Sequence, residues 1–158
     1  MFQPLKKWAV IDTCLYPHSR QLFIDSLIKE ARNMGMDCDE PLVKDKVRPE
    51  QASSVFEELL RKKQQIIVII IEDKGNDLYQ TFKLMGDTQA MIPSQFVLRK
   101  NAQGRGKGQP PSPATIHNII LKINSKLGGT NQQLAGPNKA EIKIGQSQNF
   151  IFQEPVTL

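Results

Sequence analysis

The chain has 158 residues, of which 39% are hydrophobic and 23% charged, a composition typical of one folded domain with a sizeable core. Its formal charge of +5 and its pI near 9.3 permit a phosphate-bearing partner without requiring one. Two cysteines without CxxC spacing, only two histidines and no apolar run longer than a strand argue against a disulfide framework, a zinc site and a membrane span, so we expect a cytoplasmic protein without metal or cofactor.

Apolar runs alternate with amphipathic stretches along the chain. In chain order they predict a strand at 7–12, a helix at 19–36, a strand at 40–47, a helix at 48–64, a strand at 65–71, a helix at 76–87, a strand at 94–101 and a helix at 113–127. Expected N-caps are Ser19, Asn76 or Asp77, and Ser112, and expected C-terminal glycines are Gly35, Gly86 and Gly128–Gly129. The run "QIIVIII" at 65–71 is β-branched and uncharged, which is typical of a central strand covered on both faces.

Two regions carry weaker patterns. The stretch "AQGRGKGQPPSP" at 102–113 is rich in glycine, proline and basic residues and predicts a mobile loop, and a last strand is expected near "NFIFQ" at 149–153. The alternation as a whole predicts an α/β fold, a Rossmann-like layered domain with a mostly parallel central sheet flanked by helices. Because such folds bind ligands beyond the carboxyl ends of their strands, the segment after 65–71 is the first place to look for a site.

That segment places an aromatic ring and an ammonium on one helical face. Tyr79 and Lys83 are four residues apart, and Tyr79 lies in the first turn, near the positive end of the helix dipole. A ring that stacks on a base and a cation that holds a phosphate are the parts of a nucleotide site, and stacking is worth about 1–3 kcal/mol. A half-buried tyrosine and a solvated lysine are the alternative interpretation of the same pattern.

Further polar residues could converge on the same anion. Gln95 opens a predicted strand and carries two amide donors, and Lys122 and Lys126 repeat the four-residue spacing on the last helix. A terminal monophosphate carries a charge of roughly −1.5 to −2 at neutral pH, and charge-assisted hydrogen bonds from two or more cations would hold it. Taken alone, Gln95 is more simply an ordinary polar residue at a strand edge, and composition leaves open whether the two lysines are a solvated edge or face an anion.

Motifs of catalysis are missing from the sequence. "GRGKG" at 104–108 does not match a Walker loop, no GxGxxG follows the first strand, and no GxSxG nucleophile elbow occurs. The carboxylates of the chain have no spacing that argues for a metal pair, and turns and helix caps account for them more simply. The residues therefore predict an anion site without catalytic machinery.

Three stretches together resemble a known family. The strand-loop-helix "IIVIIIEDKGNDLYQTFKLMGD" (66–87), then "SQFVLRKN" (94–101) and "LKINSKLGG" (121–129), resemble the MID domain of eukaryotic Argonaute proteins. "YQTFKLMGD" and "LKINSKLGG" are the most specific parts, and the opening "KWAVID" and the tail "FIFQEPV" follow the same order of elements. The quelling type of fungal Argonaute is a plausible subgroup.

The resemblance implies a domain that anchors the 5′-monophosphorylated end of a small guide RNA in RNA-mediated gene silencing. By this resemblance, Tyr79 stacks on the first guide base, and the phosphate is held by Tyr79, Lys83, Gln95, Lys122 and Lys126. The nucleotide-specificity loop corresponds to Glu72, Asp73, Lys74, Gly75, Asn76 and Asp77, and its acidic residues set it apart from the animal pattern. Asn101 matches a further contact near the first two nucleotides, and a 5′ uridine is the family-based expectation.

The resemblance also implies a molecular context. Residues 1–158 would form a single MID domain excised from a larger Argonaute protein, monomeric by itself and not an enzyme, with the slicing PIWI domain absent. Expected partners are a 5′-phosphorylated guide RNA, of siRNA or miRNA kind, and the PIWI- and PAZ-containing remainder of the same protein. Two other hypotheses stay open: a small Rossmann-like nucleotide-binding enzyme, and a protein-interaction domain whose basic loop at 99–108 touches nucleic acid non-specifically.

Overall fold

The computed structural model describes residues 1–86, 92–106 and 108–131. They belong to two units, Phe2–Gly129 and a second unit whose described residues are Met1, Thr130 and Asn131. In the second unit, the amino group of Met1 donates hydrogen bonds to the carbonyl oxygen and the hydroxyl of Thr130, at 2.9 and 2.8 Å. The strand expected at 149–153 lies outside the described residues.

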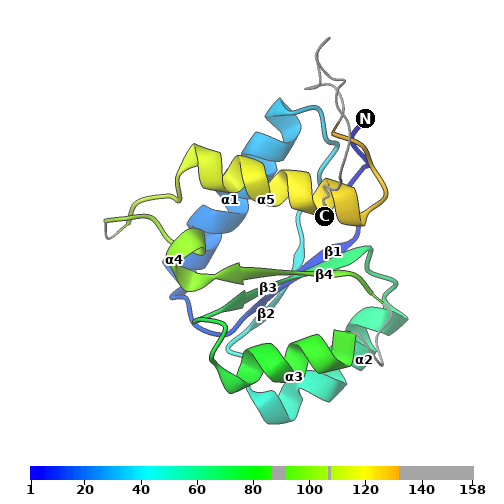
Figure 1. Cartoon of the computed structure of the whole chain (residues 1–158), viewed down its shortest axis with the longest axis vertical. Helices are drawn as coiled ribbons and strands as arrows, with labels where there is room; N and C mark the ends of the chain where they lie inside the picture. Colours follow the sequence, from blue (N-terminus) through cyan, green and yellow to red (C-terminus); the bar gives the residue numbers. More distant parts are fainter. Residues whose placement is uncertain (87–91, 107, 132–158) are drawn as a thin grey trace. The chain divides into compact units, whose positions relative to one another are not determined.

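A parallel sheet forms the centre of the Phe2–Gly129 unit (Figure 1). Its strands are β1 (Trp8–Asp12), β2 (Leu42–Asp45), β3 (Ile66–Ile71) and β4 (Ser94–Leu98), in the spatial order β2-β1-β3-β4. Val68 of β3 lies opposite Val10 of β1 on one side and opposite Gln95 of β4 on the other. The predicted α/β class with a parallel central sheet is confirmed, and β4 is an edge strand of this sheet.

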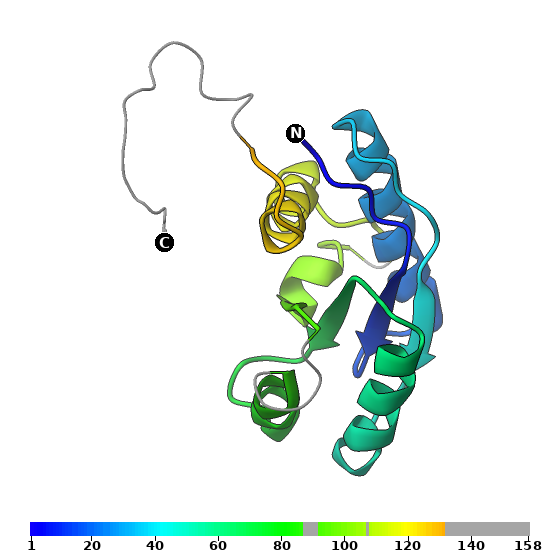
Figure 2. The ribbon, with the colours of Figure 1, turned by 90° about the vertical axis from the view of Figure 1, so that its right-hand side faces the viewer.

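Helices cover both faces of the sheet, as the two perpendicular views show (Figures 1 and 2). In the part of the chain that the structure describes, the helices are α1 (Pro17–Asn33), α2 (Ala52–Arg61), α3 (Asp77–Met85), α4 (Arg99–Ala102) and α5 (Pro113–Lys126), and a 3-10 turn, η1 (Pro49–Gln51), precedes α2. Helices α1 and α5 pack together on one face, and α2 and α3 lie on the other. The unit is therefore a three-layer α/β/α domain.

The side chains of β3 divide the core between the two layers. Ile66, Val68 and Ile70 belong to the apolar cluster under α1 and α5, whereas the alternate residues Ile67 and Ile69 belong to the cluster under α2 and α3. All of them are fully buried, and burial of each aliphatic side chain contributes roughly 1.5–3 kcal/mol. The unbroken apolar run in the sequence is thus explained by a strand with helices on both of its faces.

Two predicted boundaries were wrong for local reasons. Helix α1 begins at Pro17, two residues before the expected cap Ser19, because the fixed φ of proline suits the first helical position. Strand β4 stops at Leu98, and the next four residues, Arg99–Ala102, form the helical turn α4 instead of extending the strand to 101. Within the loop predicted at 102–113, the described chain turns back so closely that a side chain at Gly104 would collide with the backbone of Gln109.

The ends of α3 and α5 agree with the predicted caps. Asn76 caps α3 and Ser112 caps α5, each accepting a hydrogen bond from a backbone N–H of the first turn. Gly128 follows α5 with φ of +86°, a conformation that suits glycine. At Gly129 a β-carbon would overlap the side chain of Asn124, which is fully buried and accepts a hydrogen bond from the N–H of Gln3 at 2.9 Å.

Candidate anion-binding site

A hollow of about 500 Å³ lies along the free edge of β4, between α3 and α5. Every residue predicted to hold an anion lines it: Tyr79, Lys83, Gln95, Lys122 and Lys126, and so does Asn101. Its volume is in the usual range for sites that bind small molecules and nucleotides. The fold thus brings together three segments that are well separated in the sequence.

Helix α3 presents Tyr79 and Lys83 to the hollow. The side chain of Asn76 accepts a hydrogen bond from the N–H of Leu78 at 2.7 Å, which fixes the start of the helix. Because Tyr79 and Lys83 are one helical turn apart, they lie on the same side of α3, and both line the hollow. The four-residue spacing, which predicted from the sequence that Tyr79 and Lys83 share one face of the helix, therefore predicted their positions correctly.

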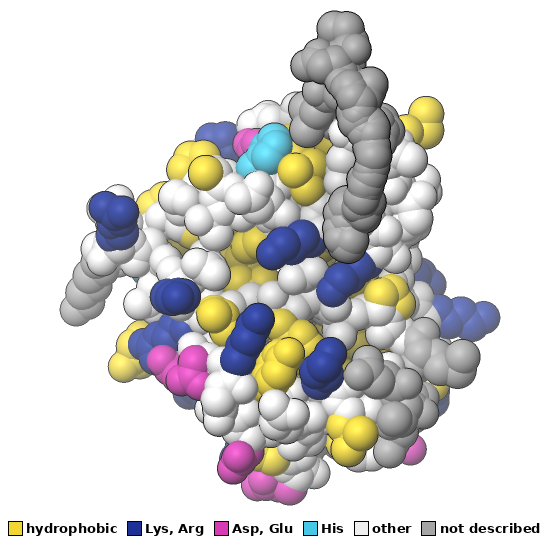
Figure 3. Space-filling model, viewed as in Figure 1, with side chains coloured by type: hydrophobic (Ala, Val, Ile, Leu, Met, Phe, Trp, Pro, Cys, Tyr) yellow, Lys and Arg dark blue, Asp and Glu magenta, His cyan; other side chains and the backbone are white. Residues whose placement is uncertain are grey.

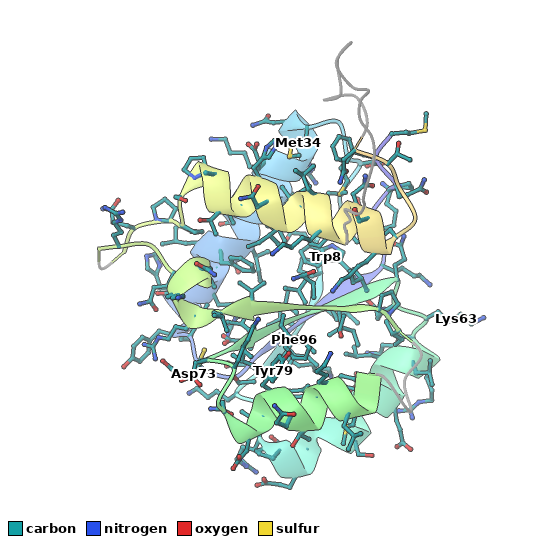
Figure 4. The ribbon with its side chains drawn as sticks, in the orientation of Figure 1. Trp8, Met34, Lys63, Asp73, Tyr79 and Phe96 are labelled. Atoms are coloured by element: carbon teal, nitrogen blue, oxygen red, sulfur yellow. The ribbon has the colours of Figure 1, made fainter. Side chains whose placement is uncertain are left out.

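The ring of Tyr79 is held by an aromatic neighbour from the sheet. Its centroid lies 4.8 Å from that of Phe96, with the two planes at 59° (Figure 4). Such tilted pairs contribute about 0.5–1.5 kcal/mol beyond the area that they bury. Tyr79 is only half-buried and lines the hollow, so a fixed aromatic surface is open to a ligand.

Gln95 contributes a buried polar group with an unused acceptor. Its side chain is only 8% exposed, and its Nε2 donates to the carbonyl oxygen of Phe96 at 3.0 Å. Its Oε1 is buried and has no hydrogen-bond partner among the described residues. Leaving a buried acceptor unpaired costs about 1–3 kcal/mol, so this atom is an independent sign of a ligand that carries a donor.

Cations dominate the charge of the hollow (Figure 3). The lysines that line it are Lys74, Lys83, Lys122 and Lys126, whereas no Asp or Glu is among its lining residues in the described ranges. The ammonium of Lys126 donates to the carbonyl oxygen of Ser94 at 2.6 Å. Burial lowers the pKa of Lys126, and the nearby charges of Lys122 and Lys83 lower it further.

These pKa effects show that the lysines from α3 and α5 lie close enough to repel one another. An anion placed among them would offset that repulsion and raise the pKa of Lys126 back toward its ordinary value. The hollow is therefore suited to a ligand with more than one negative charge.

The carboxylates of the loop between β3 and α3 make contacts within the protein that stabilise the loop and the start of α3. Glu72 forms an ion pair with Arg99, with Oε1 and Nη1 3.0 Å apart. The Oδ1 of Asp73 accepts a hydrogen bond from the N–H of Gly75 at 2.9 Å, and Asp77 lies in the first turn of α3. Of the loop residues 72–77, all of which are described, Lys74 alone lines the hollow.

Some lining residues were not predicted from the sequence. Phe96 follows Gln95 in β4, and Thr115, Asn118 and Ile119 precede Lys122 on α5. The α5 residues could have been found, because 115, 118 and 119 are spaced three, four or seven residues from Lys122 and therefore share its face. A second hollow of about 530 Å³ has Lys83, Phe96 and Lys126 in common with the first, so the cationic site extends further along β4.

The described residues contain no group of three or more His, Cys, Asp or Glu side chains that could hold a metal ion. No helix among them is long and apolar enough to span a membrane.

Comparison with known proteins identifies the family. The model of the Piwi domain family matches residues 66–152, more than half of the chain. The chain belongs to the Piwi domain family. The match begins at β3 and includes α3, β4 and α5, which are the elements that build the hollow. The tag-76 protein of Caenorhabditis elegans is 34% identical over 124 residues, which are 73% of this chain and 11% of that protein.

Solved structures share the fold of this Piwi-family chain. Drosophila Piwi superposes with a TM-score of 0.66 at 22% identity, over 80% of this chain and 18% of that one. The MID-PIWI domains of N. crassa QDE-2 AGO give 0.59 at 18% identity, over 82% and 36% of the two chains. The isolated MID domain of N. crassa QDE-2 AGO gives 0.54 at 14% identity, over 77% of this chain and 98% of that domain.

The family match confirms membership of the Piwi domain family, and the solved structures show that the chain shares the fold of Argonaute MID and MID-PIWI domains. The fungal quelling type stays a prediction, because a fly structure and fungal structures match alike. The chain spans about a tenth of the length of the nematode relative, so the activity of a whole protein is not established by the comparison.

Proposed function

We propose that this chain is the MID module of an Argonaute protein and that the hollow along β4 seats the 5′-monophosphorylated end of a small guide RNA. The observation that supports it most is the convergence of Tyr79, Lys83, Gln95, Lys122 and Lys126 on one hollow. These residues come from separate segments of the chain. If each were an ordinary solvated side chain, there would be no reason to expect them all to line the same hollow.

The phosphate is held by the cationic part of the hollow. Lys83 from α3 and the pair Lys122 and Lys126 from α5 surround a space with no lining carboxylate in the described part of the chain. A monophosphate dianion accepts charge-assisted hydrogen bonds from these ammonium groups, each worth roughly 1.5–3 kcal/mol. The pKa of Lys126, lowered in the empty site, rises again when the dianion binds, so binding and protonation support each other.

The first nucleotide is held by the aromatic and polar part of the hollow. Its base stacks on the ring of Tyr79, which packs against the ring of Phe96. The unpaired Oε1 of Gln95 accepts a hydrogen bond from a ribose hydroxyl or from a protonated phosphate oxygen, since a phosphate dianion has no donor. Asn101, which also lines the hollow, contacts the backbone that leads to the second nucleotide.

The module binds and does not catalyse. Its role is electrostatic and geometric, and any slicing belongs to the rest of a cytoplasmic Argonaute protein, which also completes the phosphate pocket. For this reason the isolated chain binds its ligand more weakly than the whole protein does.

Binding of a 5′-phosphorylated tetranucleotide and of the same RNA with a 5′-hydroxyl tests the proposal. The phosphorylated RNA is expected to bind at least about tenfold more tightly, the value of one charge-assisted hydrogen bond. Equal affinity of the two RNAs would refute it. Hydrolysis of a nucleotide in the presence of magnesium would instead support an enzyme.

A further inference from the structure

A second cationic pocket, of about 450 Å³, lies at the amino ends of the strands, and we call it the amino-end pocket. Lys7, which directly precedes β1, and Leu42, which opens β2, line one part of it. Lys63 and Gln64, in the turn between α2 and β3, line another part. Among the described residues it shares no lining residue with the hollow along β4, and β2 and β4 are opposite edges of the sheet. The two sites are therefore separate.

Cations outnumber carboxylates around the amino-end pocket. Its lining residues in the described ranges include five lysines or arginines and one acid, Glu40. Lys6 and Lys62 are ion-paired with carboxylates of the protein, at 2.8 Å in each case. The other cations of the pocket are exposed and form no ion pair within the described part of the chain: Lys7, Arg61 and Lys63. The pocket thus offers three unpaired positive charges to a ligand.

The segment that carries Lys7 is held in place by the side chain of Gln65. Its Oε1 accepts hydrogen bonds from the N–H groups of Lys6 and Lys7, both at 2.8 Å, and its Nε2 donates to the carbonyl oxygen of Pro4 at 2.9 Å. The backbone N–H of Gln65 donates to the carbonyl oxygen of Lys7 at 2.6 Å. This part of the pocket is therefore ordered before a ligand arrives, which lowers the entropy that binding costs.

Lys63 occupies a backbone position that favours glycine. It follows the carboxyl end of α2, its N–H donates to the carbonyl oxygen of Leu60 at 3.0 Å, and its φ is +56°. A lysine in this left-handed conformation is strained, because its β-carbon crowds the backbone. Its side chain lines the amino-end pocket and extends outward from the turn (Figure 4). A role for the ammonium group accounts for a lysine at this position.

Gln64 adds a hydrogen-bond acceptor without a partner. Its Nε2 donates to the carbonyl oxygen of Lys62 at 3.1 Å, whereas its Oε1 is buried and has no hydrogen-bond partner among the described residues. Buried acceptors are normally paired, so this atom points to a ligand that carries a donor. Leu42, 39% exposed, adds an apolar surface to the same pocket. The ligand that fits has negative charge, an N–H or O–H group and an apolar part.

These features favour a peptide over a nucleic acid. Each peptide unit brings an N–H donor, and acidic and apolar side chains supply the other two properties, whereas a phosphodiester group has no donor. Single-stranded nucleic acids are usually held by exposed aromatic rings. The ring that lines this pocket, Trp8, is only 1% exposed, and its Nε1 donates to the carbonyl oxygen of Asp39 at 2.7 Å.

We propose that the amino-end pocket docks an acidic segment of a partner protein. Carboxylates of that segment bind Lys7, Arg61 and Lys63, and one of its backbone N–H groups donates to Oε1 of Gln64. An apolar side chain beside the carboxylates contacts Leu42. A second copy of this chain does not fit the pocket as well, because its formal charge is +5. The surface is independent of the RNA site, so both ligands bind at the same time.

The test is a titration of the 158-residue chain at low ionic strength with a hexapeptide, blocked at both ends, in which glutamate alternates with leucine. The same peptide with glutamine for glutamate should bind at least about fivefold more weakly. Lys63→Gly should weaken binding of the acidic peptide about two- to fivefold, the value of one partly exposed ion pair, and Lys7→Gln added to it should multiply the loss. Because glycine suits the φ of this position, Lys63→Gly should not lower the melting temperature, so the loss cannot come from misfolding.

Lys46→Gly is the matched control. Lys46 is also an exposed lysine with a positive φ, +52°, but it follows the other end of β2 and does not line the amino-end pocket. This variant loses the same charge and should keep the affinity for the acidic peptide. Equal losses in Lys46→Gly and Lys63→Gly would overturn the proposal, since the peptide would then respond only to net charge.

RNA competition separates the amino-end pocket from the hollow along β4. Saturating 5′-phosphorylated RNA should leave the affinity for the acidic peptide unchanged. Displacement of the peptide by this RNA would place the peptide in the hollow and refute the docking surface, while leaving the proposed function intact. A Lys63→Gly variant that weakens binding of 5′-hydroxyl RNA and leaves peptide binding unchanged would also refute it, because the pocket would then be a nucleic-acid contact.

Discussion

Replacement of Lys122 by glutamine isolates the electrostatic part of the proposed site. Lys122 is an exposed residue on α5 whose side chain lines the hollow, and glutamine has a similar helix propensity, so the fold should tolerate the change. A charge-assisted hydrogen bond to the phosphate is worth roughly 1.5–3 kcal/mol, or about 10- to 150-fold in affinity. The measured loss should lie near the lower value, because removal of Lys122 also relieves the repulsion that lowers the pKa of Lys126.

The assay is a thermodynamic cycle of four titrations: the chain and its Lys122→Gln variant, each with 5′-phosphorylated and 5′-hydroxyl RNA of one sequence. We expect the loss with phosphorylated RNA only, and less than about twofold change with the hydroxyl form. Lys29→Gln on α1 removes the same charge outside the hollow and should affect both RNAs equally and slightly. If Lys122→Gln weakened both RNAs by one factor, the lysine would act through the general charge of the protein, and the assignment to the phosphate would be wrong.

Three further predictions test the other parts of the molecule. Tyr79→Ala should weaken RNA binding by about 5- to 150-fold, the equivalent of 1–3 kcal/mol of stacking, whereas Tyr79→Phe should stay within about threefold in the same titration, and equal losses would exclude stacking. Affinity for phosphorylated RNA should rise with pH through about 6, where the phosphate loses its second proton. As the pH rises further, affinity should decrease before pH 10.5 is reached, because the pKa of Lys126 is lowered. Lys126→Arg should move this decrease to higher pH. Gly129→Ala should lower the free energy of unfolding by about 1–3 kcal/mol in a urea titration, because the β-carbon overlaps buried Asn124, while Gly86→Ala, whose β-carbon meets only an ordinary contact, should have little effect.

The sequence predicted the layers of the fold because each element carries its own pattern. The apolar run at 66–71 requires cover on both faces, and helical spacing on either side of it supplies that cover. Boundaries that depend on competing local preferences were predicted less well. "RKN" after β4 has no strong preference for strand or helix, so the turn at Arg99–Ala102 was decided by the packing of Ala102, which is fully buried.

The site was predictable only where one helix carries two of its residues. Spacing places Tyr79 with Lys83 and Lys122 with Lys126, but no spacing rule places one pair opposite the other across β4, and the family resemblance supplied that step. The unpaired Oε1 of Gln95 could not be foreseen, because it depends on the bond that Nε2 makes to Phe96. The separation of Lys74 from its acidic neighbours also depends on contacts that the loop makes after folding.

Without a bound anion, the repulsion among the lysines of the hollow destabilises the folded chain, as the proposed function would lead one to expect. Lys126 has a lowered pKa in the folded chain and an ordinary one when unfolded, so the unfolded state binds more protons between the two values. The stability of the empty domain should therefore rise with pH as the solution approaches 10.5, the opposite of what an ion-paired lysine gives. A dianion in the hollow removes the cause of this pH dependence, because it favours the charged form of Lys126 and so raises its pKa. Phosphorylated RNA should thus raise the melting temperature most at neutral pH and least near pH 10, whereas a ligand that bound away from the lysines would stabilise the chain equally at both.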